Sequence, residues 1–301
     1  MKILVLGNSS DSHAAHMKNV LTQAGAEVHY LDTHLFPNQL NLSWQPSSQI
    51  GCLNLTGENQ FNLEDIHSVF WRSISEPYIP SLKDLNQQKI AFNDSMSTLQ
   101  TLIQACPARW VNCWEAYQFH KQKPLQLRKA RQLGIKIPAT LISNDPAQVI
   151  EFAESHEKVI FKPVSGGAHT QMVTEEHLQP KRLSLALRLS PITIQEYIPG
   201  TNIRSYVIGK SVYSAEIRSS HLDFREDSDA ELIPVELPEA IRQQCLAITH
   251  AFMLEWTAID WRLKPTGEYV FLEANFSPMF LHFEHQTNFP ITQNLVGLLM
   301  N

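Results

Sequence analysis

Apolar and polar positions alternate between strand and helix patterns at the start of the chain. Residues 2–7 are predicted to form a strand, because the apolar run at 3–6 is typical of a strand buried on both faces of a parallel sheet. Apolar residues then recur at helical spacing from Ser12 to Ala24, and residues 27–32 return to a strand pattern. The chain is therefore predicted to open with a β-α-β unit. Its first turn lacks the G-x-G-x-x-G pattern, which argues against dinucleotide binding.

The pattern weakens after this opening unit and then resumes. Residues 37–66 are polar and irregular, with short strands at best, whereas 68–73 and 81–105 are predicted to be a strand and a helix. A second unit is predicted to begin near residue 110. Its expected elements are helices at 115–133, 147–155, 182–189 and 237–253, strands at 158–164 and 192–200, and a hairpin over 203–220 that turns at Gly209-Lys210.

A hairpin is also predicted over residues 258–275, where two strand-like runs flank "KPTGE". With a loop of two or four residues, Asp260 lies opposite Glu273, and their side-chain roots are about 4.5–5.5 Å apart. Asn275 then points to the same face, whereas an odd loop would shift the register by one. Like charges placed opposite each other are destabilising, and a hard divalent cation would offset that cost.

The first hypothesis for this hairpin is therefore a magnesium site at Asp260, Glu273 and Asn275, because magnesium binds one or two carboxylates and completes its shell with water and phosphates. The alternative is a solvated acidic hairpin end.

Composition narrows the class of protein. Of 301 residues, 43% are apolar and 18% are charged, which is ordinary for a soluble globular protein with two or three sub-domains. The net charge of −6 argues against general nucleic-acid binding. No apolar run approaches the ~18 residues of a membrane span, and the first residues lack a signal-peptide pattern, so a cytoplasmic location is expected. The four cysteines show no paired metal spacing.

Two lysines are candidates for phosphate binding. Lys162 ends a predicted strand and precedes Gly166-Gly167, where glycine frees backbone amides to meet phosphate oxygens. The order of residues is the reverse of a P-loop, so this is not that motif. Lys123 lies on a basic helix. In isolation, the alternative for each lysine is a solvated side chain.

Other features suit a nucleotide or an acyl phosphate. The strand that contains Gln195–Ile198 enters a Pro-Gly bend, and its backbone could pair with an adenine edge. Arg204, Arg218 and Arg262 lie on predicted strands, and arginine forks suit carboxylate and phosphate oxygens. The alternatives are an ordinary strand and exposed or paired arginines. No serine or cysteine has an evident base beside it.

The order of these features resembles the ATP-grasp ligases. The likeness is strongest to the branch that holds glutamate ligases of the ribosomal-protein-modifying type and the maturases of microviridin-like (graspetide) peptides. It rests on "WVN" at 110–112, on the segment from Lys123 to Pro146, and on "IDWRLKPTGEYVFLEAN" at 259–275. It covers essentially the whole chain and is tightest from residue 110 onward.

The resemblance implies an α/β fold with α+β character. The expected parts are a Rossmann-like pre-ATP-grasp domain at 1–110, a central sub-domain at 111–195, and a C-terminal antiparallel-sheet sub-domain at 196–301 that carries the metal site. The implied nucleotide-binding residues are Lys123, Lys162, Ser165, Gly166, Gly167, Gln195, Glu196, Tyr197, Ile198 and Asn202. Asn202 stands where the glutamate ligases usually have an acid near the ribose.

The resemblance also implies chemistry that uses ATP and Mg²⁺. A substrate carboxylate would attack the γ-phosphate, and an amine or hydroxyl would then attack the acyl phosphate. Arg204, Arg218 and Arg262 would steady the transferred phosphate. The first hypothesis is a graspetide-type maturase that links Asp/Glu side chains of a precursor peptide to Ser/Thr or Lys.

Two alternatives to the peptide maturase stay open. One is a ligase that adds an amino acid such as glutamate to a small molecule or protein tail. The other is a nucleotide-binding protein or phosphotransferase without ligase activity. The expected partners are ATP and a carboxylate substrate, with neither nucleic acid nor membrane, and a homodimer is left open.

Overall fold

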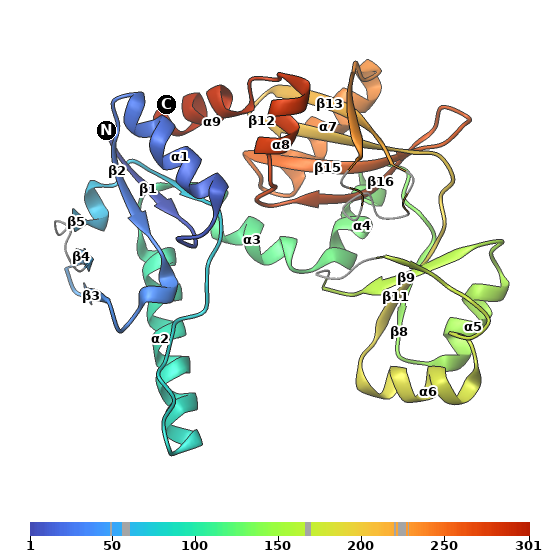
Figure 1. Ribbon diagram of the computed structural model, residues 1–301, viewed down its shortest axis with the longest axis horizontal. Coiled ribbons are helices and arrows are strands. Elements are labelled where there is room, and N and C mark those ends of the chain that lie inside the picture. The colour runs from blue at the N-terminus through green and yellow to red at the C-terminus, as the bar shows by residue number, and fades with distance from the viewer. Residues whose placement is uncertain (49, 56–60, 166–169, 220, 222–226, 228) are drawn as a thin grey trace. The chain divides into compact units, whose positions relative to one another are not determined.

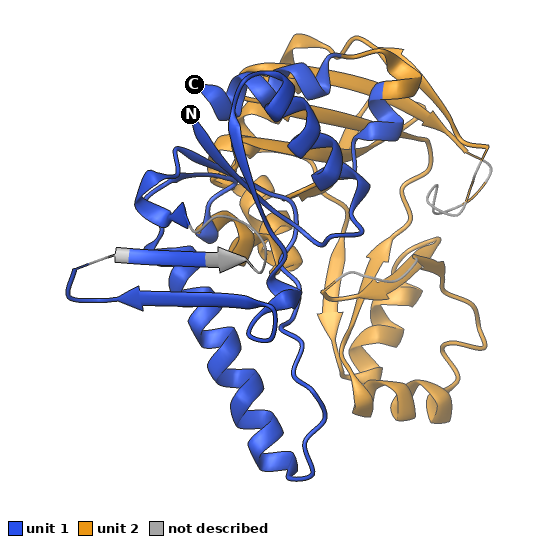
Figure 2. Cartoon of the chain, turned by 60° about the vertical axis from the view of Figure 1, so that its left-hand side comes forward, with its two compact units in different colours: residues 1–114, 279–284, 290–301 blue, residues 115–278, 285–289 orange. Residues whose placement is uncertain are grey.

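The computed structural model describes residues 1–48, 50–55, 61–165, 170–219, 221, 227 and 229–301. The chain forms two compact units, coloured separately in Figure 2. Unit 1 consists of residues 1–114, 279–284 and 290–301, and unit 2 consists of 115–278 and 285–289. The predicted boundaries near residues 110 and 195 remain predictions.

Unit 1 is built on a parallel sheet with the strand order β2-β1-β6-β7 (Figure 1). Its strands are β1 (Lys2–Leu6), β2 (Glu27–Leu31), β6 (Ser68–Trp71) and β7 (Arg109–Val111). Its helices are α1 (Ser12–Gln23), α2 (Leu85–Ala105) and α9 (Ile291–Met300). Asp11 caps α1 by accepting from the amides of His13 and Ala14, which are two of the N–H groups that a helix start leaves unpaired. The predicted β-α-β opening is confirmed.

A second, smaller sheet lies in the stretch that the sequence presented as irregular. β3 (Leu40–Gln45), β4 (Ile50–Leu55) and β5 (Phe61–Asn62) pair antiparallel, and the short helices η1 (Thr33–Leu35) and η2 (Leu63–Asp65) flank them. Leu40, Leu53 and Phe61 are buried. The short strands that the prediction allowed for are present, but they pair into a sheet instead of lying in irregular chain, because sparse apolar residues suffice for one buried face.

Unit 2 contains a four-stranded antiparallel sheet of order β10-β9-β11-β8. Its elements are β8 (Thr140–Ser143), β9 (Val159–Pro163), β10 (Gln171–Met172), β11 (Ile192–Glu196), α5 (Pro146–Glu154) and α6 (Pro180–Leu189). Both helices pack on one face of this sheet (Figure 1), where Val149, Leu187 and Ile194 belong to one core cluster. Because side chains alternate along a strand, Lys162 and Gln195 are directed to the opposite face.

The larger sheet of unit 2 has five antiparallel strands in the order β14-β13-β12-β15-β16. They are β12 (Thr201–Ile208), β13 (Ser211–Arg218), β14 (Glu231–Val235), β15 (Trp256–Leu263) and β16 (Tyr269–Asn275). The remaining helices are α3 (Trp114–His120), α4 (Lys123–Gln132), α7 (Glu239–Ala251) and α8 (Leu281–Thr287). The single helix predicted at 115–133 is therefore two helices. Pro124 lies in the first turn of α4, where its missing N–H costs nothing.

The hairpin of β15 and β16 differs from its prediction at the turn and agrees with it at the far end. Leu263 pairs with Tyr269, which leaves an odd loop, so the expected loop of two or four residues was wrong. A β-bulge then shifts the register between Asp260 and Trp261, and Asp260 pairs with Glu273. The extra residue of the bulge thus restores the pairing that an odd loop would have lost.

The segment that leads from β11 into β12 passes very close to β15. Gly200 has φ +130°, and a Cβ added there would lie 2.0 Å from the carbonyl oxygen of Leu263. Only glycine fits both the dihedral angle and the close approach. In the described part of the chain, no helix combines the length and the apolar character needed to cross a membrane.

Candidate active site

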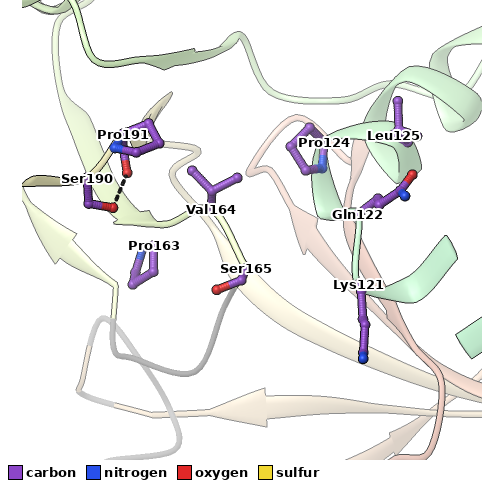
Figure 3. A pocket seen from close by; sticks show the side chains of 9 residues that line it. All are labelled: Lys121, Gln122, Pro124, Leu125, Pro163, Val164, Ser165, Ser190 and Pro191. Atoms are coloured by element: carbon purple, nitrogen blue, oxygen red, sulfur yellow. Dashed lines mark hydrogen bonds between the residues drawn. The ribbon is translucent and has the colours of Figure 1, made fainter. Parts of the chain in front are cut away.

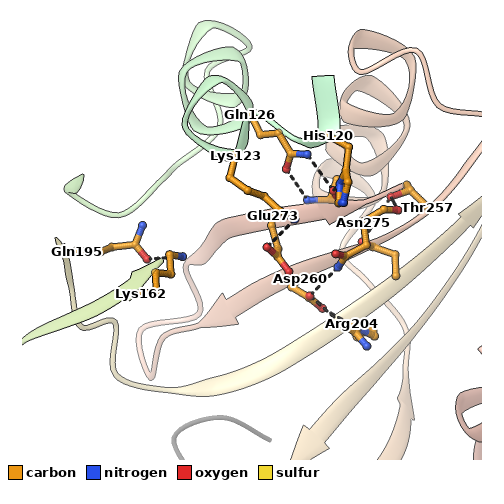
Figure 4. A network of polar contacts seen from close by, with 12 residues as sticks. His120, Lys123, Gln126, Lys162, Gln195, Arg204, Thr257, Asp260, Glu273 and Asn275 are labelled. Carbon is orange, nitrogen blue, oxygen red and sulfur yellow. Dashed lines mark hydrogen bonds and ion pairs between the residues drawn. The ribbon is translucent and has the colours of Figure 1, made fainter. Parts of the chain in front are cut away.

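The three residues predicted to bind metal converge in unit 2 (Figure 4). Asp260 and Glu273 are paired across β15 and β16, and the Asn275 side-chain amide donates to Asp260 Oδ2 at 3.2 Å. Thr257 Oγ1 donates to the Asn275 carbonyl oxygen at 2.7 Å, which fixes the end of β16. Two carboxylates and an amide therefore share one face, as the hairpin prediction required.

Arg204 neutralises one of the carboxylates. Its Nε and Nη2 donate to the two oxygens of Asp260 at 2.7 and 2.8 Å, a bidentate pair between neighbouring strands β12 and β15. Burial alone would lower the pKa of Arg204, but Asp260 raises it above its ordinary value. The guanidinium is thus a fixed positive charge directly beside the candidate metal ligands.

Lys123 neutralises the other carboxylate. Lys123 is the first residue of α4, and its Nζ lies 2.9 Å from Glu273 Oε2. Burial would raise the pKa of Glu273, but the ammonium of Lys123, aided by Lys162 and Arg204, holds that pKa well below its usual range. The sequence suggested a divalent cation, or Arg262 paired with Glu273, as the counter-charge, whereas the structure places Lys123 and Arg204 beside the two carboxylates.

A stripe of side chains at 120, 123 and 126 faces the outer edge of β16. Gln126 Nε2 donates to the Ala274 carbonyl oxygen at 3.1 Å, and the Ala274 amide donates to Gln126 Oε1 at 3.0 Å. His120 Nδ1 lies 3.4 Å from the same carbonyl oxygen, and burial together with Lys123 lowers the pKa of His120 to about 4. His120 and Gln126 were not predicted, although each lies three residues from Lys123, a spacing that places side chains on the same face of a helix.

Lys162 and Gln195 form a second polar pair on the smaller sheet. Lys162 Nζ donates to Gln195 Oε1 at 3.3 Å, and Gln195 Nε2 donates to Thr140 Oγ1 at 2.8 Å. Gln195 is 1% exposed, so its side chain is committed to holding the lysine. Gln195 also lies on β11, which pairs with β9 on one side and β8 on the other, so a contact of Gln195 with a nucleotide stays a prediction.

The backbone of the predicted adenine hinge is partly engaged by neighbouring segments. The amides of Glu196 and Tyr197 donate to the carbonyl oxygens of Ala139 and Lys158, and the Glu196 carboxylate accepts from the Ala139 amide. The Ile198 carbonyl oxygen accepts from Arg262. Adenine recognition through this segment would thus fall to its remaining backbone atoms, and it stays a prediction.

Arg262 lies at the hinge and not beside Glu273. Its Nε donates to the Ile198 carbonyl oxygen at 3.1 Å, its Nη1 donates to Asn202 Oδ1 at 2.9 Å, and its guanidinium lies 5.9 Å from the Tyr197 ring centroid. Burial lowers the pKa of Arg262. These contacts indicate that Arg262 fixes the hinge, so a role on the transferred phosphate gains no support from the geometry.

Arg218 stands apart from the contacts around Asp260. It lies at the end of β13 with an exposed side chain, and its Nε donates to Glu216 Oε1 at 3.3 Å. Its predicted role on the acyl phosphate stays a prediction without structural support. Of the three candidate arginines, Arg204 alone contacts a candidate metal ligand among the residues that the structure describes.

Ser165 lines a pocket of about 500 Å³ in unit 2 (Figure 3). One wall comes from Lys121, Gln122 and Pro124, just before and within the first turn of α4, and another comes from residues 163–165 at the end of β9. Gly166 and Gly167, the other members of the predicted phosphate loop, lie outside the described residues.

The donor set of the hairpin fits a hard cation. Two carboxylates and an amide oxygen are the ligands that magnesium accepts, and phosphate oxygens and water complete its shell. Within the described ranges, no three His, Cys, Asp or Glu residues gather as a metal cluster, so the third donor of the candidate site is the amide of Asn275. The site is suited to a cation that arrives with a phosphate-bearing ligand.

Comparisons with known proteins agree with this arrangement. The family model of the MvdD pre-ATP-grasp domain matches residues 2–118. The macrocyclase MdnC from Microcystis aeruginosa MRC, solved with its precursor peptide MdnA, is 27% identical, with a TM-score of 0.89 and 100% of each chain covered. A RiPP-associated ATP-grasp ligase from Chryseobacterium gregarium, solved with ADP and a leader and core peptide, is 26% identical, with a TM-score of 0.88 over 99% of this chain and 96% of that one.

A more distant similarity is found among curated proteins. The uncharacterized protein MJ0776 from Methanocaldococcus jannaschii is 24% identical over 176 residues, which are 58% of this chain and 44% of that protein. The chain thus matches less than half of the archaeal protein's length.

Proposed function

We infer that this chain, an ATP-grasp ligase of the branch that contains the graspetide maturases, uses ATP to join a carboxylate to an amine or hydroxyl of a precursor peptide. The resemblance noted in the sequence is confirmed by the matched pre-ATP-grasp model and by the whole-chain likeness to MdnC. ATP and Mg²⁺ are the cofactors that follow from this assignment.

The observation that carries the proposal is the convergence of opposite charges on the β15–β16 hairpin. Asp260, Glu273 and Asn275 present oxygen donors, and Lys123 and Arg204 lie within hydrogen-bonding distance of the two carboxylates. A metal–triphosphate complex needs both kinds of group at once, because the ion bridges phosphate oxygens while lysines meet the rest of the charge. A solvated acidic turn would not need two partly buried cations beside it.

Each side chain then has a defined role when the nucleotide is bound. The ammonium groups of Lys123 and Lys162 would hold phosphate oxygens, and Arg204 would stabilise charge on the transferred phosphate while it orients Asp260. Asp260, Glu273 and Asn275 would hold magnesium, which neutralises charge that develops on the phosphates. Arg262 would keep the hinge in place through Ile198 and Asn202.

The reaction balances without a covalent enzyme intermediate. An oxygen of the substrate carboxylate attacks the γ-phosphorus, the bond to the bridging oxygen breaks, and ADP leaves with its electron pair. An amine or hydroxyl then attacks the acyl carbon, loses its proton, and expels inorganic phosphate to give an amide or ester. Positioning and electrostatic stabilisation supply the catalysis.

A peptide substrate is favoured by the solved relatives. MdnC was solved with its precursor peptide, and the Chryseobacterium ligase was solved with a leader and core peptide. The proposed product is therefore a peptide in which Asp or Glu side chains are linked to Ser, Thr or Lys. A ligase that extends a small molecule or protein tail with an amino acid is the alternative within the same chemistry.

Mass spectrometry distinguishes these products. The purified chain is incubated with ATP, Mg²⁺ and a peptide, encoded beside its gene, that is rich in Ser/Thr and Asp/Glu. The proposal predicts ADP release and the loss of one water from the peptide for each link formed. Glu273→Gln should form no ADP while its circular dichroism stays that of the wild type. When glutamate is added to the same reaction, a peptide that instead gains the mass of glutamate less one water would favour the alternative. ADP formation at the wild-type rate by Glu273→Gln would contradict the site.

A further inference from the structure

At Ala274, the side chain of Gln126 covers the outer edge of β16. β16 is the last strand of its sheet, so its outer backbone groups have no neighbouring strand. Gln126 takes that place, because its amide both donates to the carbonyl oxygen and accepts from the N–H of Ala274, at 3.1 and 3.0 Å. Gln126 is 1% exposed, so these bonds are shielded from water.

The position of this contact aligns the helix with the strand. Ala274 lies between Glu273 and Asn275, and Gln126 lies one helical turn after Lys123 on the same face of α4. Because Gln126 forms hydrogen bonds with both the N–H and the carbonyl oxygen of one residue, it fixes the position of α4 along β16. In that register the Lys123 ammonium meets Glu273 Oε2 at 2.9 Å.

We propose that Gln126 is a positioning residue for the nucleotide site, which sets Lys123 opposite Glu273 through its two hydrogen bonds to Ala274. The inference rests on the proposed function, since the lysine that Gln126 aligns is the one assigned to phosphate oxygens. Gln126 itself touches neither metal nor phosphate in this account. It acts only through the relative placement of α4 and β16.

Binding of Mg²⁺–ADP, measured by calorimetry, tests this role without any peptide. Gln126→Met keeps the volume of the side chain and removes both hydrogen bonds, and it is expected to weaken Mg²⁺–ADP binding about tenfold, as the loss of supporting residues does at other sites. Gln132→Met, at the exposed end of α4, is the matched control and should bind as the wild type does. If Gln126→Met does not fold, Gln126→Asn, whose amide is one methylene too short to reach Ala274, replaces it.

A double-mutant cycle separates positioning from a general loss of stability. In a Lys123→Ala background, Gln126→Met should change the dissociation constant less than about twofold, because the group that it aligns is gone. An equal loss of affinity in both backgrounds, or wild-type affinity in folded Gln126→Met, would overturn the positioning role alone. A wild-type chain that did not bind Mg²⁺–ADP would overturn the proposed function, and this inference would fail with it.

Discussion

At the scale of single residues, some contacts of the candidate site could be predicted from the sequence and others could not. Asp260, Glu273 and Asn275 were predicted from strand alternation, and the structure brings them together. The partners Arg204 and Lys123 come from other elements, so their contacts depend on tertiary packing. Arg262 lies two residues after Asp260 on the same strand. That position did not reveal that the guanidinium of Arg262 donates to Ile198 and Asn202.

The buried imidazole of His13 is expected to make the free energy of unfolding depend on pH. It is 5% exposed in unit 1, and its Nδ1 accepts from the Phe280 amide at 3.2 Å. Burial and then Arg72 lower the pKa of His13 to about 4, with His16 acting in the same direction and Asp11 opposing them. Between pH 6.5 and pH 4, His13 is protonated in the unfolded chain but not in the folded chain. The free energy of unfolding therefore falls as the pH falls.

Replacing this imidazole should flatten that dependence. His13→Asn places an amide oxygen near the position of Nδ1, and it lacks a group that titrates. Its free energy of unfolding in urea should be lower than that of the wild type at pH 7, but it should lose about 1–2 kcal/mol less between pH 7 and pH 5. An equal loss in both proteins over that range would show that His13 does not titrate as described.

At the scale of elements, the sequence pattern predicted the positions of helices and strands more accurately than their boundaries and turns. The helix predicted from 115 to 133 divides at residues 121–122, just before Pro124. The odd loop of the β15–β16 hairpin is compensated by a bulge that no local sequence pattern indicated. The pairing of Asp260 with Glu273 was right even though the assumed loop was wrong. The bulge shifted the register back by one residue and so restored the pairing that the odd loop alone would have lost.

Gly200 provides a prediction for the linker between β11 and β12. Gly200→Ala should lower the free energy of unfolding by more than about 2 kcal/mol, because strained backbone and a clash with the Leu263 carbonyl oxygen combine. Gly209→Ala is the matched control, since Gly209 also has a positive φ of 57° but meets nothing within 4 Å, and it should cost about 1 kcal/mol. Urea denaturation measures both, and equal losses would argue against the close approach at Gly200.

At the scale of the whole molecule, the α/β class with antiparallel sheets and the ATP-grasp resemblance were predictable, and both are confirmed. The return of the chain to unit 1 was not predictable. Ile291, Leu295 and Leu299 of α9 are buried in unit 1, where Ser68 Oγ donates to the Leu299 carbonyl oxygen at 2.7 Å. Helical periodicity shows which face of α9 is apolar, but it does not show which distant sheet that face covers.

The central claim is that Asp260, Glu273 and Asn275 hold a cation that in turn holds a nucleotide. Isothermal titration of ADP into the whole chain, with and without Mg²⁺, tests it most directly. The account predicts that Mg²⁺ strengthens ADP binding to the wild type and gives no such gain to folded Glu273→Gln. Affinity that is the same with and without Mg²⁺, or a full gain in Glu273→Gln, would contradict it.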